Sequence, residues 1–202
     1  FETGLVKAGQ GFTMKGPGSG TTSNTQNYVF VGKPNNGDIN HNINPNNLSL
    51  LGNPYPSAID ANQFILDNIN VIDENGDIIN AGITTGALYF WEHFPTNNSH
   101  ALSAYEGGYA TYNLAGATMA IPDPDVSANG TGTKLPQRYI PVGQAFFVQG
   151  GEGGAISFNN NQRTFVTEAS GSSIFMFTSN DEEESTEVSE PNDDIDRIYF
   201  KY

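Results

Sequence analysis

The stretch Leu51-Gly-Asn-Pro-Tyr-Pro-Ser-Ala-Ile-Asp-Ala-Asn-Gln-Phe-Ile65 joins the end of a strand to a turn and the start of a helix. The apolar run 48–51 predicts a buried strand. Two prolines then end it, because proline removes a ladder donor and keeps the residue before it extended. Ser57 and Asp60 have the spacing of a helix-capping box and precede helix-spaced apolar residues. The stretch therefore predicts a short helix near residues 57–66.

The composition favours many short strands joined by loops. The 202 residues include 23 Gly, 11 Pro and 24 Asn, types that are common in turns. A chain of this length buries one sizeable core. Acidic residues outnumber basic ones 22 to 8, and the formal net charge of −14 repels nucleic acid and anionic membranes. We therefore expect no nucleic-acid partner.

Two absences exclude further classes of protein. Cysteine is absent, which excludes disulfides, thiolate metal sites and cysteine nucleophiles. No apolar run is long enough to cross a bilayer, so we expect no direct membrane insertion.

Strand patterns recur along the chain with turn signals between them. The Asn75-Gly76 pair between β-branched runs predicts a hairpin, and residues 140–148 and 155–158 predict a second one around a glycine-rich loop. Residues 35–47 and 121–137 are expected to be long loops, and 87–93 a central strand. Other strands are predicted at 5–15, 27–32, 109–114, 164–166 and 174–177. The predicted fold is all-β, a β-sandwich of jelly-roll-like type with one short helix near residues 57–66.

The two ends and one acidic run suggest the domain organisation. Residues 1–180 are expected to form one β-sandwich domain that lacks part of its N-terminal side. Residues 181–196 hold nine carboxylates and no base, which is typical of a solvated linker. A calcium-collecting strip is the alternative. Residues 197–202 alternate like a strand just begun and are expected to open a following β-domain, so we interpret the chain as a fragment of a longer polypeptide.

Three blocks of the sequence together resemble a known family. They are residues 51–65, residues 140–148 with the core Pro-Val-Gly-Gln-Ala-Phe-Phe-Val, and residues 156–165, with support from 11–16 and 28–38. Their order resembles the β-rich region of large Bacteroidetes surface proteins exported by the type nine secretion system. The resemblance implies a secreted or cell-surface module, often part of an adhesive or structural giant, and it implies no particular activity.

Oxygen-bearing side chains alternate at Asp73, Asn75 and Asp77, as in part of a calcium loop. Calcium takes six to eight oxygens, and the position of the distant glutamate of an EF-hand is occupied by Thr84. The alternatives are a weak structural calcium site and a hairpin turn with solvated carboxylates. The same alternatives apply to a second cluster, Asp123, Asp125 and Asn129.

The aromatic strand around Trp91 is a candidate binding element. Alternation places Tyr89 and Trp91 on one face of this strand. Together with Tyr109 and Tyr112 of the run 109–114, they are candidate ligand-binding residues, because aromatic faces stack on the C–H side of sugar rings. The alternative is that these rings pack in the core.

No catalytic constellation is present. The N-terminal glycines lack the Gly-Lys-Ser/Thr of a phosphate loop, and neither a Gly-x-Ser-x-Gly elbow nor a His-Glu-x-x-His motif occurs. Glu92 and His93 are adjacent in a strand and therefore point to opposite faces. A hydrolase with paired carboxylates remains a third hypothesis, but no acid pair stands out. We expect the protein not to be an enzyme.

These observations predict a non-catalytic segment of a large exported cell-surface protein, adhesive or structural, in a surface layer or filament. Its expected location is extracellular, at the outer cell surface. Its expected partners are other surface proteins, polysaccharide, or the rest of the same long polypeptide. The alternative is a carbohydrate-binding module of a secreted polysaccharide-degrading protein, which an exposed, coplanar Tyr89–Trp91 platform would favour. No cofactor is expected apart from weakly bound structural calcium.

Overall fold

The computed structural model describes residues 5–13, 27–69, 71–72, 74–75, 77–80, 82–94, 104–126, 129–167, 171–173 and 197–201. Within these residues strands dominate and one short α-helix occurs. The elements in chain order are β1 (Asn27–Val31), β2 (Ile39–Ile43), β3 (Leu48–Gly52), β4 (Ala58–Asp60), α1 (Ala61–Asn68), β5 (Val71–Ile72), β6 (Ile78–Asn80), β7 (Thr84–His93), β8 (Gly107–Asn113), β9 (Gly116–Pro122), β10 (Tyr139–Ile140), β11 (Ala145–Gly150), β12 (Gly154–Phe158), the 3₁₀ helix η2 (Asn160–Gln162), β13 (Arg163–Thr164) and β14 (Arg197–Lys201).

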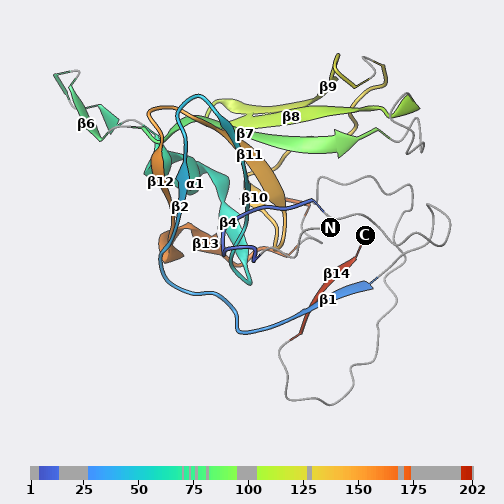
Figure 1. Cartoon of the computed structure of the whole chain (residues 1–202), viewed down its shortest axis with the longest axis horizontal. Helices are drawn as coiled ribbons and strands as arrows, with labels where there is room; N and C mark the ends of the chain where they lie inside the picture. The colour runs from blue at the N-terminus through green and yellow to red at the C-terminus, as the bar shows by residue number, and fades with distance from the viewer. Residues whose placement is uncertain are drawn as a thin grey trace.

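The main sheet has five antiparallel strands in the order β3-β11-β7-β8-β9. Strand β7 lies in the middle, which confirms that the aromatic strand is central. Burial alternates along β7, because successive side chains of a strand point to opposite faces. Leu88 and Phe90 are buried on what we call the inner face, whereas Tyr89 and Trp91 are partly exposed on the outer face. In the upper part of Figure 1, strands β9, β8 and β7 lie next to one another in this order from the top downward.

Helix α1 packs on the inner face. Its buried residues are spaced to form one stripe: Ala61, Phe64, Ile65 and Asn68. The Phe64 ring meets Phe146 of β11 edge-on at a centroid distance of 5.4 Å and Phe158 of β12 at 5.0 Å. The hydrophobic core therefore lies around α1, between the main sheet and the β2–β12 pair.

Four smaller antiparallel sheets complete the described structure. They are β10-β4-β13, β12-β2, β5-β6 and β1-β14. The β1–β14 pair lies apart from the main sheet (Figure 1). The fold is thus all-β and sandwich-like with a single short helix in the described residues, as predicted from the sequence. The domain boundaries predicted near 180 and 196 lie outside the described residues, and the assignment of 197–202 to a following domain stays a prediction.

The turn after β3 is held together by the buried side chain of Asn53. Its Nδ2 donates to the carbonyl oxygens of Ser57 (2.8 Å), Ile140 (3.3 Å) and Pro141 (3.1 Å). Its Oδ1 accepts from the backbone N–H of Tyr55 at 3.0 Å. The proline-bounded stretch is therefore an architectural turn that ties β3 to the segment between β10 and β11.

The helix begins later than the sequence predicted. Residues 58–60 form β4, which pairs with β10 and β13 and is therefore extended. Asp60, not Ser57, is the N-cap, and its carboxylate accepts from the N–H of Asn62 at 3.0 Å. The predicted capping box at Ser57 is wrong, because strand pairing holds the residues that a helix starting there would need.

The predicted hairpin between residues 140–148 and 155–158 is also wrong. Strand β11 pairs with β3 and β7, whereas β12 pairs with β2. Gly153 and Gly154 have φ angles of 74° and 123°, a region that other residues rarely adopt. These two glycines let the chain turn away from β11 of the main sheet and form β12, which pairs with β2.

Some of the other predicted strands are present in the structure and some are not. The structure confirms strands at 27–32 (β1), 48–51 (β3) and 109–114 (β8), as well as the β5–β6 hairpin around Asn75. The strand predicted at 164–166 is wrong beyond Thr164, because β13 ends at that residue. The predicted loop 35–47 contains β2, residues 5–13 form no strand beyond an isolated Gln10–Leu51 bridge, and β9 has no counterpart among the predicted strands. Residues 174–177 lie outside the described residues.

Candidate functional site

A continuous run of aromatic rings lies on the outer face of the main sheet. We call it the aromatic strip, and it consists of Phe147, Tyr109, Trp91, Tyr105 and His93. Neighbouring ring centroids are 5.7, 4.9, 6.2 and 4.4 Å apart in this order. Tyr109 meets its two neighbours edge-on, at 88° and 70°. The Tyr105 ring is parallel to the Trp91 ring to within 3° and to the His93 ring to within 4°. Edge-to-face and offset contacts of this kind are the arrangements that aromatic pairs prefer.

Strand register brings the strip together from three strands. Trp91 of β7 lies opposite Tyr109 of β8, and Tyr89 lies opposite Phe147 of β11. The prediction that Tyr89 and Trp91 share a face is confirmed by the alternating burial of β7. Three of the four predicted ligand-binding residues, Tyr89, Trp91 and Tyr109, are therefore on one surface.

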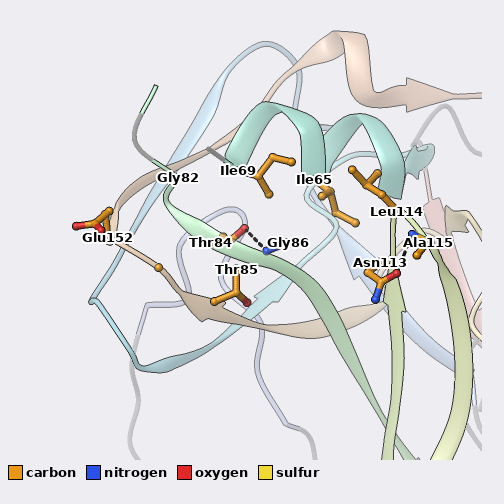
Figure 2. A pocket seen from close by; sticks show the side chains of 11 residues that line it. Ile65, Ile69, Gly82, Thr84, Thr85, Gly86, Asn113, Leu114, Ala115 and Glu152 are labelled. Carbon is orange, nitrogen blue, oxygen red and sulfur yellow. Dashed lines mark hydrogen bonds between the residues drawn. The ribbon is translucent and has the colours of Figure 1, made fainter. Parts of the chain in front are cut away.

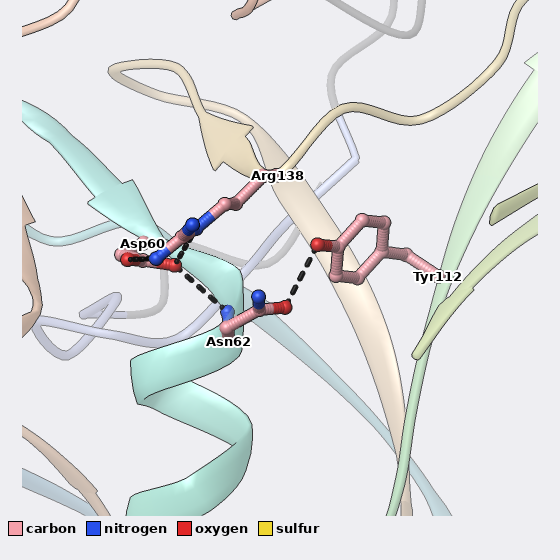
Figure 3. Close-up of polar contacts among 4 residues, drawn as sticks. All are labelled: Asp60, Asn62, Tyr112 and Arg138. Carbon is pink, nitrogen blue, oxygen red and sulfur yellow. Dashed lines mark hydrogen bonds and ion pairs between the residues drawn. The ribbon is translucent and has the colours of Figure 1, made fainter. Parts of the chain in front are cut away.

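Tyr112 belongs to the opposite face, so its grouping with the other three is corrected. It is 8% exposed, and its hydroxyl donates to Oδ1 of Asn62 at 2.8 Å at the start of α1 (Figure 3). An odd separation of three residues from Tyr109 puts the two side chains on opposite faces of β8. Burial raises the pKa of the Tyr112 hydroxyl, and the charge of Arg138 opposes part of this effect.

The position of Trp91 depends on the absence of a side chain at Gly107. A Cβ added at Gly107 would lie 2.5 Å from Cζ2 of Trp91, so only glycine lets the indole lie here. The indole Nε1 donates to the Tyr105 hydroxyl at 3.3 Å. Backbone contact and this hydrogen bond together fix the orientation of the indole.

The outer face is largely apolar, and its strands carry no lysine or arginine. The aromatic strip is partly buried, while two aliphatic side chains near it are well exposed: Leu48 (59%) opposite Gln149 and Ile121 (72%) opposite Tyr109. The five strands of the sheet contain no lysine or arginine. Burial, and then the charge of Asp123, raises the pKa of the Tyr109 hydroxyl, which is therefore neutral near pH 7.

Sequence reasoning missed Phe147 as a member of the strip. Its signal was available, because Phe146 is buried and β11 alternates with a period of two residues. One of two adjacent phenylalanines in a central strand must face outward.

Glu92 has a structural environment. As predicted, it lies on the face opposite to His93, and its side chain is fully buried. Its Oε1 accepts from the N–H (2.8 Å) and hydroxyl (3.0 Å) of Thr133 and from the N–H of Lys134 (3.3 Å). Burial lowers the pKa of the Lys134 ammonium, and the charge of Glu92 opposes this effect. Glu92 thus anchors the segment 129–138 to the inner face.

A second polar network fixes the start of α1. Arg138 donates to both carboxylate oxygens of Asp60, from Nε at 3.0 Å and from Nη2 at 2.7 Å (Figure 3). Burial opposes ionisation of Asp60, but the hydrogen bonds and charge of Arg138 outweigh it and lower the pKa of this carboxyl. The network ties the start of α1 to Arg138, the residue before β10. The carboxylate and the guanidinium are hydrogen-bonded to each other.

The predicted calcium sites gain no support from the described residues. Asn75 and Asp77 are exposed in the β5–β6 connection, and Asp73 lies outside the described residues. In the second cluster, the carboxylate of Asp123 accepts from the N–H of Asp125 at 2.9 Å, as in a tight turn. No group of three or more His, Asp or Glu side chains suited to a metal occurs in the described part of the chain. Calcium binding stays a prediction.

An open depression of about 560 Å³ lies at the far end of the inner face, beside the end of α1. Figure 2 shows Ile65 of the helix and Ile69, which follows its last residue, above Thr84 and Gly86 of β7. The Thr84 hydroxyl accepts from the Gly86 N–H and donates to the Asn68 carbonyl, both at 3.3 Å. The Thr84 hydroxyl in the depression is thus already hydrogen-bonded to nearby backbone groups, and the depression has no assigned role.

Comparisons with known proteins identify a family but no function. In the described residues, no helix is long and apolar enough to cross a membrane. No curated protein matches the chain, and no solved structure matches it. A family model described as a domain of unknown function (DUF8693) matches residues 2–198, and the chain therefore belongs to this family.

Proposed function

We propose that the chain is a non-catalytic segment of a large exported cell-surface protein, with an adhesive or structural role outside the cell. The observation that carries this proposal is the outer face, where the aromatic strip lies beside exposed Leu48 and Ile121. Aromatic and aliphatic side chains gathered on one accessible face are typical of a surface that meets a partner.

The environment of the acids in the inner layer supports a non-catalytic role. Glu92 is held by Thr133 and Lys134, and Asp60 by Arg138. Asp67 accepts from the side chains of Gln162 and Asn159, at 2.7 and 2.8 Å. A general acid or base needs to reach a substrate, whereas these carboxylates hold the inner layer together.

Two measurements test the proposal. Intact producing cells are treated with an added protease and probed with an antibody to this chain, which should be cleaved while a cytoplasmic marker survives. Beads coated with the purified chain should also attach to such cells, and beads coated with the variant Tyr109→Ala should attach several-fold less. Full protection of the chain on intact cells would overturn the extracellular location.

The matched control for the bead assay is Phe165→Ala. Phe165 is 92% exposed and lies outside the main sheet, so its removal deletes an exposed aromatic ring without touching the outer face. Equal loss of attachment with both variants would contradict a role specific to the outer face.

A further inference from the structure

The geometry of the aromatic strip restricts the kind of partner that the outer face fits. Trp91 and Tyr105 are parallel to within 3° and are joined by a hydrogen bond at 3.3 Å, so their faces share one orientation. A flat ligand that stacks on one ring is therefore also parallel to the other. The Tyr105 ring is itself stacked on His93 with a centroid distance of 4.4 Å, which holds it in place. These rings form a rigid, preorganised surface, which lowers the entropic cost of binding.

The charge of the outer face excludes anionic partners. The five strands contain no lysine or arginine, and their one carboxylate, Glu92, is buried on the inner face. Asp123 lies close enough to Tyr109 to raise its pKa, and the chain carries a formal charge of −14. A sulfated or uronic polymer would meet repulsion from the acidic chain and no lysine or arginine on these strands to pair with.

Neutral polar groups accompany the rings. Thr111 of β8 and Gln149 of β11 are partly exposed and occupy outer-face positions, opposite Tyr89 and Leu48 respectively. The Tyr105 hydroxyl accepts from Trp91, and no acceptor for its own proton is found among the described residues. A sugar ring offers the complement, with apolar C–H faces for stacking and hydroxyls around its edge for hydrogen bonds.

We infer that the outer face binds a neutral polysaccharide chain, with Trp91 and Tyr105 as the stacking residues. This inference rests on the proposed function and names the partner of the same face. The polymer lies across β11, β7 and β8, following the ring run from Phe147 to His93. The aliphatic residues are on the edge strands β3 and β9, so the centre of the face offers a partner aromatic rings and neutral polar groups.

Tryptophan fluorescence gives a direct readout, because Trp91 is the single tryptophan of the chain. The purified chain is titrated with neutral polysaccharides (hydroxyethyl cellulose, xyloglucan, xylan and galactomannan) and with anionic alginate. We expect a shift of the emission maximum with at least one neutral polymer and none with alginate. The same polymers in native gels should retard the migration of the chain.

Variants assign the binding to the strip. Tyr105→Ala should weaken binding to the neutral polymer at least tenfold while Trp91 still reports it, and Phe165→Ala should leave it unchanged. Tyr105 lies outside the strands, so its replacement leaves the sheet register intact, which the thermal unfolding midpoint checks. Trp91→Phe, followed by gel retardation, keeps a ring at the position and should retain part of the affinity.

The outcomes separate this inference from the proposed function. If no neutral polymer changes fluorescence or migration, or if Tyr105→Ala binds like the wild type, the inference is overturned. If bead attachment is nonetheless lost in Tyr109→Ala, the outer face contacts a protein partner and the proposed function holds. Retardation by alginate equal to that by the neutral polymers would also contradict the inference, because it shows no charge selection.

Discussion

Both faces of the main sheet carry aromatic and aliphatic side chains, yet only one of them is buried. On the inner face, Phe90 and Phe146 are almost completely buried. On the outer face, Trp91 and Tyr109 remain partly exposed and pack edge-on against one another. The difference lies in what covers each face, since the strands that supply both are the same.

Three devices cover the inner face. The first is the apolar stripe of α1. The second is the segment 129–138, anchored by Glu92. The third is the ion pair between Asp60 and Arg138, which fixes the helix start. The strands therefore supply apolar side chains to both faces. The polar anchors decide which face is covered and becomes part of the core.

The largest expected effect comes from removing the helix side chain at the centre of the core. Phe64→Ala should lower the free energy of unfolding by about 3–5 kcal/mol, because Phe64 is fully buried between Phe146 and Phe158. The outer-face counterpart Tyr109→Ala should cost about 1–2 kcal/mol, since its ring is only partly buried. Urea unfolding followed by circular dichroism measures both.

Equal losses of unfolding free energy in Phe64→Ala and Tyr109→Ala would contradict this difference between the two faces. In that case the outer face would be packed as tightly as the core, and the binding role would lose its basis. A conservative Phe64→Leu serves as the inner control, and it should recover most of the stability because it refills the space.

The second effect concerns the anchor at Glu92. Glu92→Ala should cost about 2–3 kcal/mol, because it leaves the N–H groups of Thr133 and Lys134 without their acceptor. Glu92→Gln keeps one acceptor oxygen and should cost less. Hydrogen exchange at residues 133 and 134 should accelerate more than exchange in β8 in both variants.

A uniform acceleration throughout the chain would instead mean that Glu92 supports global stability and not the cover of one face. Glu152→Gln, which changes an exposed carboxylate, should leave both exchange rates unaltered.

Local patterns predicted the strands and the central place of β7, because period-two alternation depends on neighbours in sequence. They failed at β2, whose polar Ile-Asn-His-Asn-Ile sequence becomes a strand through pairing with β12. They failed again at Ser57, where pairing of β4 overrides the capping signal. In the site, alternation grouped Tyr89 with Trp91, and the same rule, applied to Tyr112, would have removed it from the group.

Other features of the site depend on contacts between distant residues. The stacking of Tyr105 on His93 and the bonds from Thr133 to Glu92 join segments separated by loops. A single sequence carries no signal for such pairs. Gly107, which lets the indole lie here, precedes the strand predicted at 109–114 and stands beside Gly108, so the sequence pattern did not single it out.

The smallest effect is expected from the third device, and it depends on pH. The folded-state pKa of Asp60 is lowered, so its ion pair adds stability above the ordinary carboxyl pKa of about 4 and loses it as the pH falls below that value. Asp60→Asn keeps an N-cap acceptor and removes the charge, which isolates the ion pair from the cap. Urea midpoints of the variant should lie slightly below wild type at about pH 7, and the gap should narrow as the pH falls below about 4 toward the lowered pKa of Asp60. A constant gap would mean that the carboxylate acts through hydrogen bonding alone, and that charge plays no part in covering the inner face.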